Sequence, residues 1–233
     1  MGSAPNLKFV VYEDVSVVLK DRCTSIVIAL NLFSLGFCRN FSKPNVVFWV
    51  DGIFGKWFLH LKGFSLEKTP GVDVLEGLIS SGLIKEVSIF GSCSADFRFL
   101  CKENGINIVY ENSMLAVDLN TMILDPKAVF TDVVIITLPS PKQEFLAFQI
   151  AERAHGSKIL CIGGAANMVG NKKLRAPKWI SAMNIEWIFR LKTDTRRRSW
   201  RLVSSLLSVT LNLKRLRKCD LTVRRKTSPY FHD

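Results

Sequence analysis

Short apolar runs recur along the first two thirds of the chain, and spacers with a helix-like pattern separate them. The runs are rich in Val, Ile and Phe and show no polar alternation, which is typical of strands buried on both faces. They cover residues 25–30, 46–50, 87–90, 106–110, 133–136 and 159–162. Residues 72–82, 95–104 and 143–154 are long enough for crossover helices. The pattern predicts a mainly parallel, doubly wound, Rossmann-like α/β sheet with helices on both faces.

A polar loop, residues 137–144, lies between the apolar run 133–136 and a helical pattern over 145–154. Its two prolines, Pro139 and Pro141, must end the strand because proline cannot continue regular pairing. The loop then presents a cation, an amide and a carboxylate at the carboxyl end of a strand, where open α/β sheets bind ligands. The loop is therefore a candidate site.

Other polar clusters also follow predicted strands directly. They are Asn31, Asp51-Gly52, Gly91-Ser92 and the glycine-rich segment 163–167. Glycines at strand ends let backbone N–H groups approach phosphate oxygens closely. Several such clusters on one sheet edge indicate a nucleotide or diphosphate ligand.

Asp51 follows a very apolar run and is therefore a partly desolvated carboxylate suited to general-base work. The alternative is an aspartate that only caps the following turn. Glu144 is either a substrate ligand or a first-turn residue that complements the helix dipole. Lys142 is either a phosphate partner or a solvated lysine. Signature motifs of zinc proteases, serine hydrolases, P-loop proteins and dinucleotide-binding proteins are absent from the sequence.

Charge divides the chain into two predicted parts, an α/β catalytic body (1–171) and a basic helical appendage (172–233). Residues 1–171 carry 15 Lys/Arg and 16 Asp/Glu, whereas residues 172–226 carry 17 Lys/Arg and 3 Asp/Glu. A segment this basic is expected to bind a polyanion, either a nucleic acid or an anionic bilayer. A hydrophobic fraction of 48% with 22% charged residues argues against disorder.

The appendage shows two helical stretches, about 177–191 and a second one beyond residue 198. The second places large apolar side chains on one face and basic side chains on the other, which is typical of an interfacial membrane helix. The alternative is a helix that packs on the body with a solvated basic face. We favour the membrane interpretation, and we expect the chain after Leu221 to be loose. The apolar residues of this face are Trp200, Val203, Leu206, Leu207, Leu213 and Leu216.

Cysteine, histidine and hydropathy patterns point to a reduced, cytosolic protein. The six cysteines lie singly, and the three histidines are far apart, so their spacing predicts no metal site. No leader pattern precedes the acidic pair Glu13-Asp14. The longest apolar stretch, 25–37, is shorter than the roughly twenty residues of a membrane span.

Two stretches resemble the WecG/TagA/CpsF glycosyltransferase family (glycosyltransferase family 26). Ser140-Pro-Lys-Gln-Glu144 is similar to the family's G-x-P-[KR]-Q-E loop, with Pro139 in place of its first glycine. Residues 175–179 and 186–191 are similar to its R-A-P-x-W and E-W-x-x-R-L signatures. Asp51-Gly52 resembles its D-G segment, Asn31 its N-terminal asparagine and Gly71-Val-Asp73 its G-x-D. The resemblance runs from about residue 24 to residue 202.

The resemblance implies an inverting glycosyltransferase that moves a sugar from a UDP-sugar to a polyprenyl-diphosphate-linked acceptor at the cytoplasmic face of the membrane. Asp51 would be the general base, Asn31 and Gln143 would hold the substrates, and Lys142 would stabilise the departing diphosphate. No D-x-D motif is present, so we expect no essential metal and no cofactor. We also expect no nucleic-acid partner, because Trp200 stands on the aliphatic face of the tail and not among its basic residues. The remaining implied site residues are Gly52, Lys68, Asp73, Gly91, Ser140, Glu144, Gly163 and Asn167, with Arg175, Glu186 and Arg190 in the appendage.

Besides Pro139, the chain departs from the family pattern at three places: Lys68 stands for an arginine, Ala166-Asn167 for phenylalanine-aspartate and Asp194-Thr195 for glutamate-proline. A lysine cannot grip a phosphate bidentately. Altered donor specificity is one explanation, and a non-catalytic relative that binds a nucleotide sugar is the other. The rival class is a nucleic-acid-binding module that uses the basic tail. The sugars are left open, as is a homo-oligomer.

Overall fold

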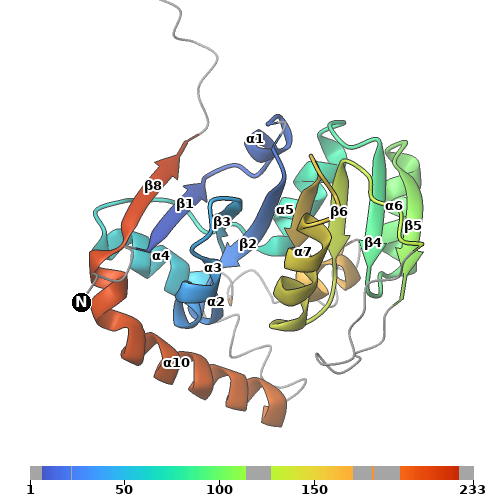
Figure 1. The fold of residues 1–233 in the computed structure, drawn as a ribbon. Helices are drawn as coiled ribbons and strands as arrows, with labels where there is room; N and C mark the ends of the chain where they lie inside the picture. The colour runs from blue at the N-terminus through green and yellow to red at the C-terminus, as the bar shows by residue number, and fades with distance from the viewer. Residues whose placement is uncertain (1–6, 22, 114–126, 170–179, 181–194, 226–233) are drawn as a thin grey trace, which may run out of the picture.

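A computed structural model describes residues 7–21, 23–113, 127–169, 180 and 195–225. Within these residues eight strands form one sheet in the order β5-β4-β6-β7-β2-β3-β1-β8, and every pair is parallel (Figure 1). The predicted fold class is confirmed. The strands are β1 Lys8–Tyr12, β2 Ser25–Leu30, β3 Val46–Val50, β4 Glu86–Phe90, β5 Asn107–Asn112, β6 Val133–Ile136, β7 Lys158–Cys161 and β8 Asp220–Arg224.

Helices cover both faces of the sheet, and each face has its own apolar core. The first face carries α2 Leu32–Gly36, α3 Cys38–Phe41, α4 Gly52–Leu61, α7 Lys142–Ala151 and α10 Thr195–Lys218. The second carries α1 Ser16–Leu19, α5 Gly71–Ser80, α6 Ala95–Glu103 and the short 3-10 helix η2 Gly163–Asn167. The crossover helices expected from the sequence correspond to α5, α6 and α7.

Six strands were predicted, and three of them (β2, β3 and β6) have the expected bounds. The prediction missed β1 and β8, which pair with each other at one side of the sheet over five residues. The expectation of a loose chain after Leu221 was therefore wrong for Thr222 to Arg224, which belong to β8. Residues 226–233, to which the same expectation applied, lie outside the described residues. The basic segment thus supplies both α10 and the last strand of the sheet.

The long tail helix α10 confirms the second of the two predicted tail helices. Its small and polar side, which includes Ser205 and Ser208, packs on α2, where a Cβ at Gly36 would lie 3.0 Å from the Ser208 Cβ. Asn212 Nδ2 donates a hydrogen bond of 3.0 Å to the carbonyl oxygen of Gly36. Leu216 does not belong to the exposed face, as the sequence suggested, because it is buried in the first core. The first predicted tail helix lies outside the described residues, apart from the buried Ile180.

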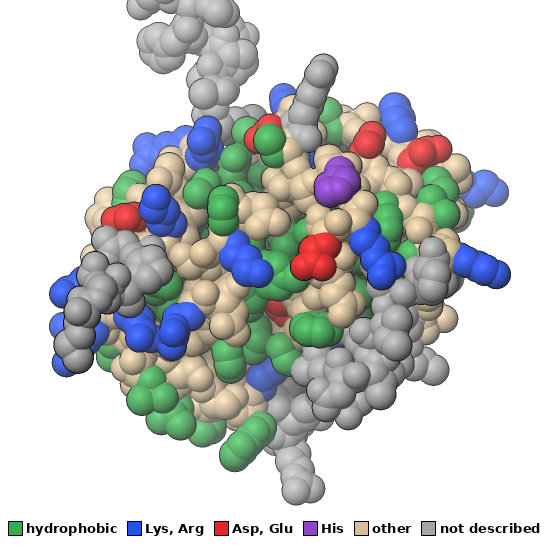
Figure 2. Space-filling model, in the orientation of Figure 1, with side chains coloured by type: hydrophobic (Ala, Val, Ile, Leu, Met, Phe, Trp, Pro, Cys, Tyr) green, Lys and Arg blue, Asp and Glu red, His purple; other side chains and the backbone are tan. Residues whose placement is uncertain are grey.

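The large apolar side chains of α10 point away from the body instead. Trp200, Val203, Leu207 and Leu211 are 58–77% exposed. Figure 2 shows hydrophobic side chains along the lower left rim of the molecule, where α10 lies, with basic side chains above them. Of the helices in the described ranges, none has the length and hydropathy needed to cross a membrane.

Candidate active site at the carboxyl edge of the sheet

The strand-end residues singled out in the sequence lie along one edge of the sheet. Asn31 and Asp51 follow β2 and β3, whose last residues, Leu30 and Val50, are register partners. The loop before α5 returns to this point, because the Thr69 N–H donates to the carbonyl oxygen of Val50 at 2.8 Å. Lys68 precedes Thr69 and is therefore held near the end of β3.

The glycine-rich segment η2 lies next to the predicted G-x-D motif. A Cβ at Gly71 would lie 3.5 Å from the Ala165 Cβ, so the start of α5 is in contact with η2. Asp73 stands in the first turn of α5, and Asn167 is the last residue of η2. The turn after β4 joins the same group, since Ser94 Oγ donates to the Ala166 carbonyl oxygen at 3.2 Å.

Gly91 ends β4 beside the loop that follows β6. Its φ of +110° requires glycine, and a Cβ there would overlap the Thr137 hydroxyl. Gly163 also has a positive φ, and a Cβ there would lie 3.6 Å from Gln143 Oε1. The ends of β4, β6 and β7 therefore meet along the 137–144 loop.

Ser140, Gln143 and Glu144 form a buried hydrogen-bonded cluster. Ser140 Oγ donates to Glu144 Oε1 at 2.6 Å, and Gln143 Nε2 donates to both partners at 2.8 and 2.9 Å. Gln143 and Glu144 are 6% and 3% exposed. Gln143 Oε1 and Glu144 Oε2 have no hydrogen-bond partner among the described residues. Two buried acceptors thus lack donors, which is the condition that a hydroxyl- or amide-bearing ligand would satisfy.

Burial raises the pKa of Glu144, while hydrogen bonds from Ser140 and Gln143 and the charge of Arg201 oppose the shift. Arg201 belongs to α10, so the tail helix comes close enough to this loop to influence its electrostatics. Glu144 is also the acidic residue of the first turn of α7, so the dipole interpretation and the ligand interpretation both fit its position. Lys142 is half-buried at the start of the same helix.

Asp51 is the N-cap residue of α4, but its side chain makes no capping hydrogen bond. The interpretation of Asp51 as only a cap therefore loses its basis, and the half-buried carboxylate stays a candidate base. Asn31 behaves differently, because its side-chain oxygen accepts from the Ser34 N–H at 3.1 Å and caps α2. Gly52, next to Asp51, has a φ of +74°.

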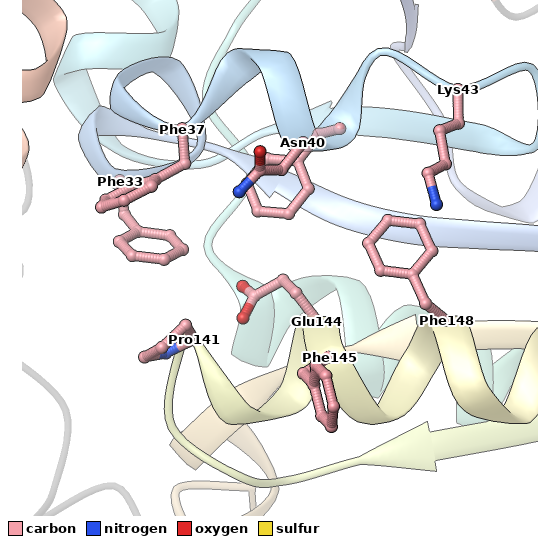
Figure 3. Close-up of a pocket in the computed structure, with 9 residues that line it drawn as sticks. Phe33, Phe37, Asn40, Lys43, Pro141, Glu144, Phe145 and Phe148 are labelled. Carbon is pink, nitrogen blue, oxygen red and sulfur yellow. The ribbon is translucent and has the colours of Figure 1, made fainter. Parts of the chain in front are cut away.

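An aromatic pocket beside this edge was not predicted from the sequence. It lies between α2–α3 and α7 and has a volume of about 360 Å³ (Figure 3). The sequence does contain a pattern that could have indicated the pocket, because phenylalanines recur at helical spacing on both walls. The lining residues are Phe33, Phe37, Asn40, Phe41, Lys43, Pro141, Glu144, Phe145 and Phe148.

Several predicted features of the site concern other parts of the chain. Arg175, Glu186 and Arg190 lie outside the described residues. Within the ranges that are described, no three His, Cys, Asp or Glu side chains are arranged to hold a metal ion. All six cysteines are free thiols, and only Cys23 is exposed.

Comparison with known proteins agrees with the motifs. The family profile described as "Glycosyl transferase WecG/TagA/CpsF family" matches residues 39–220. N-acetylglucosaminyldiphosphoundecaprenol N-acetyl-beta-D-mannosaminyltransferases of Staphylococcus aureus strains NCTC 8325 / PS 47 and COL are each 18% identical over 165 residues, which is 68% of this chain and 63% of the relative. The chain thus spans less than two thirds of the length of these curated relatives. Since the family profile covers most of the chain, from α3 to the start of β8, the chain belongs to the WecG/TagA/CpsF glycosyl transferase family.

Proposed function

We propose that the protein is an inverting glycosyltransferase that moves a hexose or N-acetylhexosamine-type sugar from a UDP-sugar to a polyprenyl-diphosphate-linked sugar. The observation that carries the proposal is the position of Asp51 at the end of β3, on the sheet edge that also gathers the glycine-rich segment and the Ser140–Glu144 loop. The names of the Staphylococcus aureus relatives support a lipid-linked acceptor.

In this reaction Asp51 takes the proton from the acceptor hydroxyl, and the oxygen attacks the anomeric carbon of the donor sugar. The bond between that carbon and the diphosphate oxygen breaks, and UDP leaves from the opposite side, which inverts the configuration. Backbone N–H groups of the glycine-rich turns and the cation of Lys142 stabilise the negative charge on UDP. One carboxylate is sufficient for this chemistry, so we propose that no metal is essential.

Asp51→Asn tests the assignment of the base. The substitution keeps the shape of the side chain but removes its ability to accept the proton, so transfer should fall by about 10²–10⁴-fold. Transfer of radiolabelled sugar to a lipid-diphosphate acceptor measures this, with and without a chelator. Asp96→Asn, an exposed first-turn position of α6, is the matched control and should leave transfer unchanged. Near-normal turnover of Asp51→Asn in a folded protein would remove Asp51 from this role.

We also propose that α10 holds the protein on the inner, cytoplasmic face of the membrane. The helix exposes Trp200, Val203, Leu207 and Leu211, and its last turn carries Arg215, Arg217 and Lys218. Apolar side chains that enter the headgroup region, with cations next to them, suit an anionic bilayer. A nucleic-acid surface would instead place its aromatics among basic residues for base stacking, whereas Trp200 stands in an aliphatic row.

A further inference from the structure

The aromatic pocket is a groove whose two walls come from α2–α3 and α7. A continuous row of rings crosses from one wall to the other: the centroids of Phe37 and Phe33 on α2–α3 are 4.7 Å apart, those of Phe33 and Phe41 6.3 Å, and those of Phe41 and Phe148 of α7 6.5 Å. The pocket volume of about 360 Å³ lies in the range of small-molecule sites, roughly 300–1,000 Å³.

Polar groups face this aromatic wall at defined positions. The Glu144 carboxylate points from α7 into the space between the helices, with Asn40 on the opposite side (Figure 3). Glu144 is 3% exposed, and its Oε2 has no hydrogen-bond partner in the described part of the chain. At the other end Lys43 Nζ lies 4.1 Å from the centroid of the Phe148 ring. The pocket thus combines flat apolar surfaces, an acceptor that needs a donor, and a cation.

This combination matches a sugar phosphate more closely than a hydrocarbon chain. A pyranose ring has an apolar face that packs on aromatic rings and hydroxyl or amide N–H groups that donate to a carboxylate. A prenyl chain would occupy the same volume but would leave Glu144 Oε2 without a donor, which costs free energy at a buried position.

The pocket also borders the candidate site. Phe33 is two residues beyond Asn31, and Glu144 adjoins Gln143, so the Glu144 end of the groove borders these strand-end residues. Asn31 and Asp51 follow the neighbouring strands β2 and β3. The groove lies on the first face of the sheet, whereas the glycine-rich segment contacts α5 and α6 on the second face. The two substrates can therefore approach the edge from different faces.

We propose that this groove is the subsite for the sugar ring of the lipid-linked acceptor, with Glu144 accepting a hydrogen bond from a ring hydroxyl or amide N–H and Lys43 facing the diphosphate. The proposal rests on the proposed function. It makes Phe37 and Glu144 determinants of acceptor affinity. The donor would then bind at the glycine-rich segment, on the second face of the sheet.

The test uses N-acetylglucosaminyl diphosphate carried on a short alkyl chain and on a long prenyl chain. Phe37→Ala removes a ring that is 36% exposed at the rim of the groove, and Glu144→Gln exchanges the carboxylate for an amide. Each should raise the acceptor KM about tenfold for both chain lengths, with an unchanged donor KM. Phe99→Ala, an exposed phenylalanine on α6, is the matched control and should change neither KM. Equilibrium binding of the short-chain compound, without donor, should weaken by the same factor.

Three results would overturn the inference. An unchanged acceptor KM in both variants would show that the groove does not hold the acceptor, a penalty that appears only with the long chain would show that it holds the lipid, and a raised donor KM would show that it holds the nucleotide sugar. Failure of the proposed function is a different result, in which wild-type protein neither transfers sugar from any UDP-sugar nor binds the acceptor compound.

Discussion

At the scale of single residues, Gly55 in α4 is the position near the site that leaves the least room for a side chain. A Cβ at this position would overlap the carbonyl oxygen of Leu30, the last residue of β2. The missing side chain lets α4 approach the end of β2, and this approach sets the place of Asp51 at the N-terminus of the helix. Gly55, which has no side chain to react, therefore positions the candidate base Asp51.

Gly55→Ala should destabilise the protein by about 1–3 kcal/mol, because the overlap is with backbone atoms that cannot rotate away. Denaturant unfolding followed by circular dichroism measures the change. Gly77→Ala in the exposed face of α5 is the control: nothing lies within 4 Å of its Cβ, and it should stabilise the protein by about 0.5–1 kcal/mol. Equal effects of the two substitutions would contradict the close contact.

Glu144 makes stability depend on pH in a predictable direction. Its pKa is raised above the ordinary 4.5 by burial, so the folded protein holds this proton more tightly than the unfolded chain does. The contribution of Glu144 is complete below pH 4.5 and is lost as the pH rises through the folded value. The free energy of unfolding of wild type, relative to Glu144→Gln, should therefore fall from acidic to neutral pH. A difference that is flat with pH, or that rises, would contradict this.

The residues that define the candidate site could be found in the sequence because polar residues after buried apolar runs mark strand ends. The individual roles of these residues could not be predicted from the sequence. The capping bond of Asn31 and the buried cluster of Ser140, Gln143 and Glu144 depend on backbone geometry that spacing does not record. The aromatic pocket depends on two segments about a hundred residues apart in sequence, which only the packing of α2 and α7 on β2 brings together.

At the scale of elements, α10 has an inverted arrangement for a helix on a protein surface. Small side chains, Ser205 and Ser208, face the body, while Leu207 and Leu211 face outward. Amphipathic periodicity in the sequence predicted the helix correctly, but it could not tell which face is covered by the protein. The close approach at Gly36 of α2 decides this.

Leu207→Ser should weaken binding to anionic vesicles about tenfold or more, because burial of a leucine side chain in an apolar environment is worth about 1.5–3 kcal/mol. Co-sedimentation with phosphatidylglycerol vesicles measures this. Leu83→Ser removes another exposed leucine, between α5 and β4, and serves as the control; Leu83 is 44% exposed and Leu207 60%. Unchanged sedimentation of the Leu207 variant would argue against the proposed membrane face. Truncation before α10 is a poorer test, because it also removes Leu216 and β8 from the fold.

Strand prediction succeeded where both faces of a strand are buried and failed at one side of the sheet. Residues of β2, β3, β6 and β7 are buried throughout, so continuous apolar runs mark them. β8 alternates exposed and half-buried residues within a basic segment, and β1 alternates buried residues with exposed or half-buried ones, so neither strand is a continuous buried run. Their pairing is a tertiary contact between the two ends of the described chain.

At the scale of the whole molecule, the parallel sheet has two helix-covered faces, and its carboxyl edge lies where the two faces meet. The first face carries the aromatic groove and α10, the second carries the glycine-rich segment with α5 and α6, and the carboxyl edge joins them (Figure 1). Parallel pairing makes this division possible, since every strand delivers its following loop to the same edge.

The return of the chain through β8 has a mechanical consequence for α10. The helix is tied at its C-terminal end by Leu216, Cys219 and the five-residue pairing of β8 with β1, and Lys62 Nζ donates to the carbonyl oxygen of Arg217 at 2.7 Å. In its middle it rests on α2 through Ser208 and Asn212, and the charge of Arg201 acts on Glu144. On the membrane face proposed above, a helix fixed in this way would serve as a spacer of constant height. With its leucines in the bilayer, it would hold Asp51 at one set distance above the lipid, and only a sugar carried at that height by its diphosphate would meet the base.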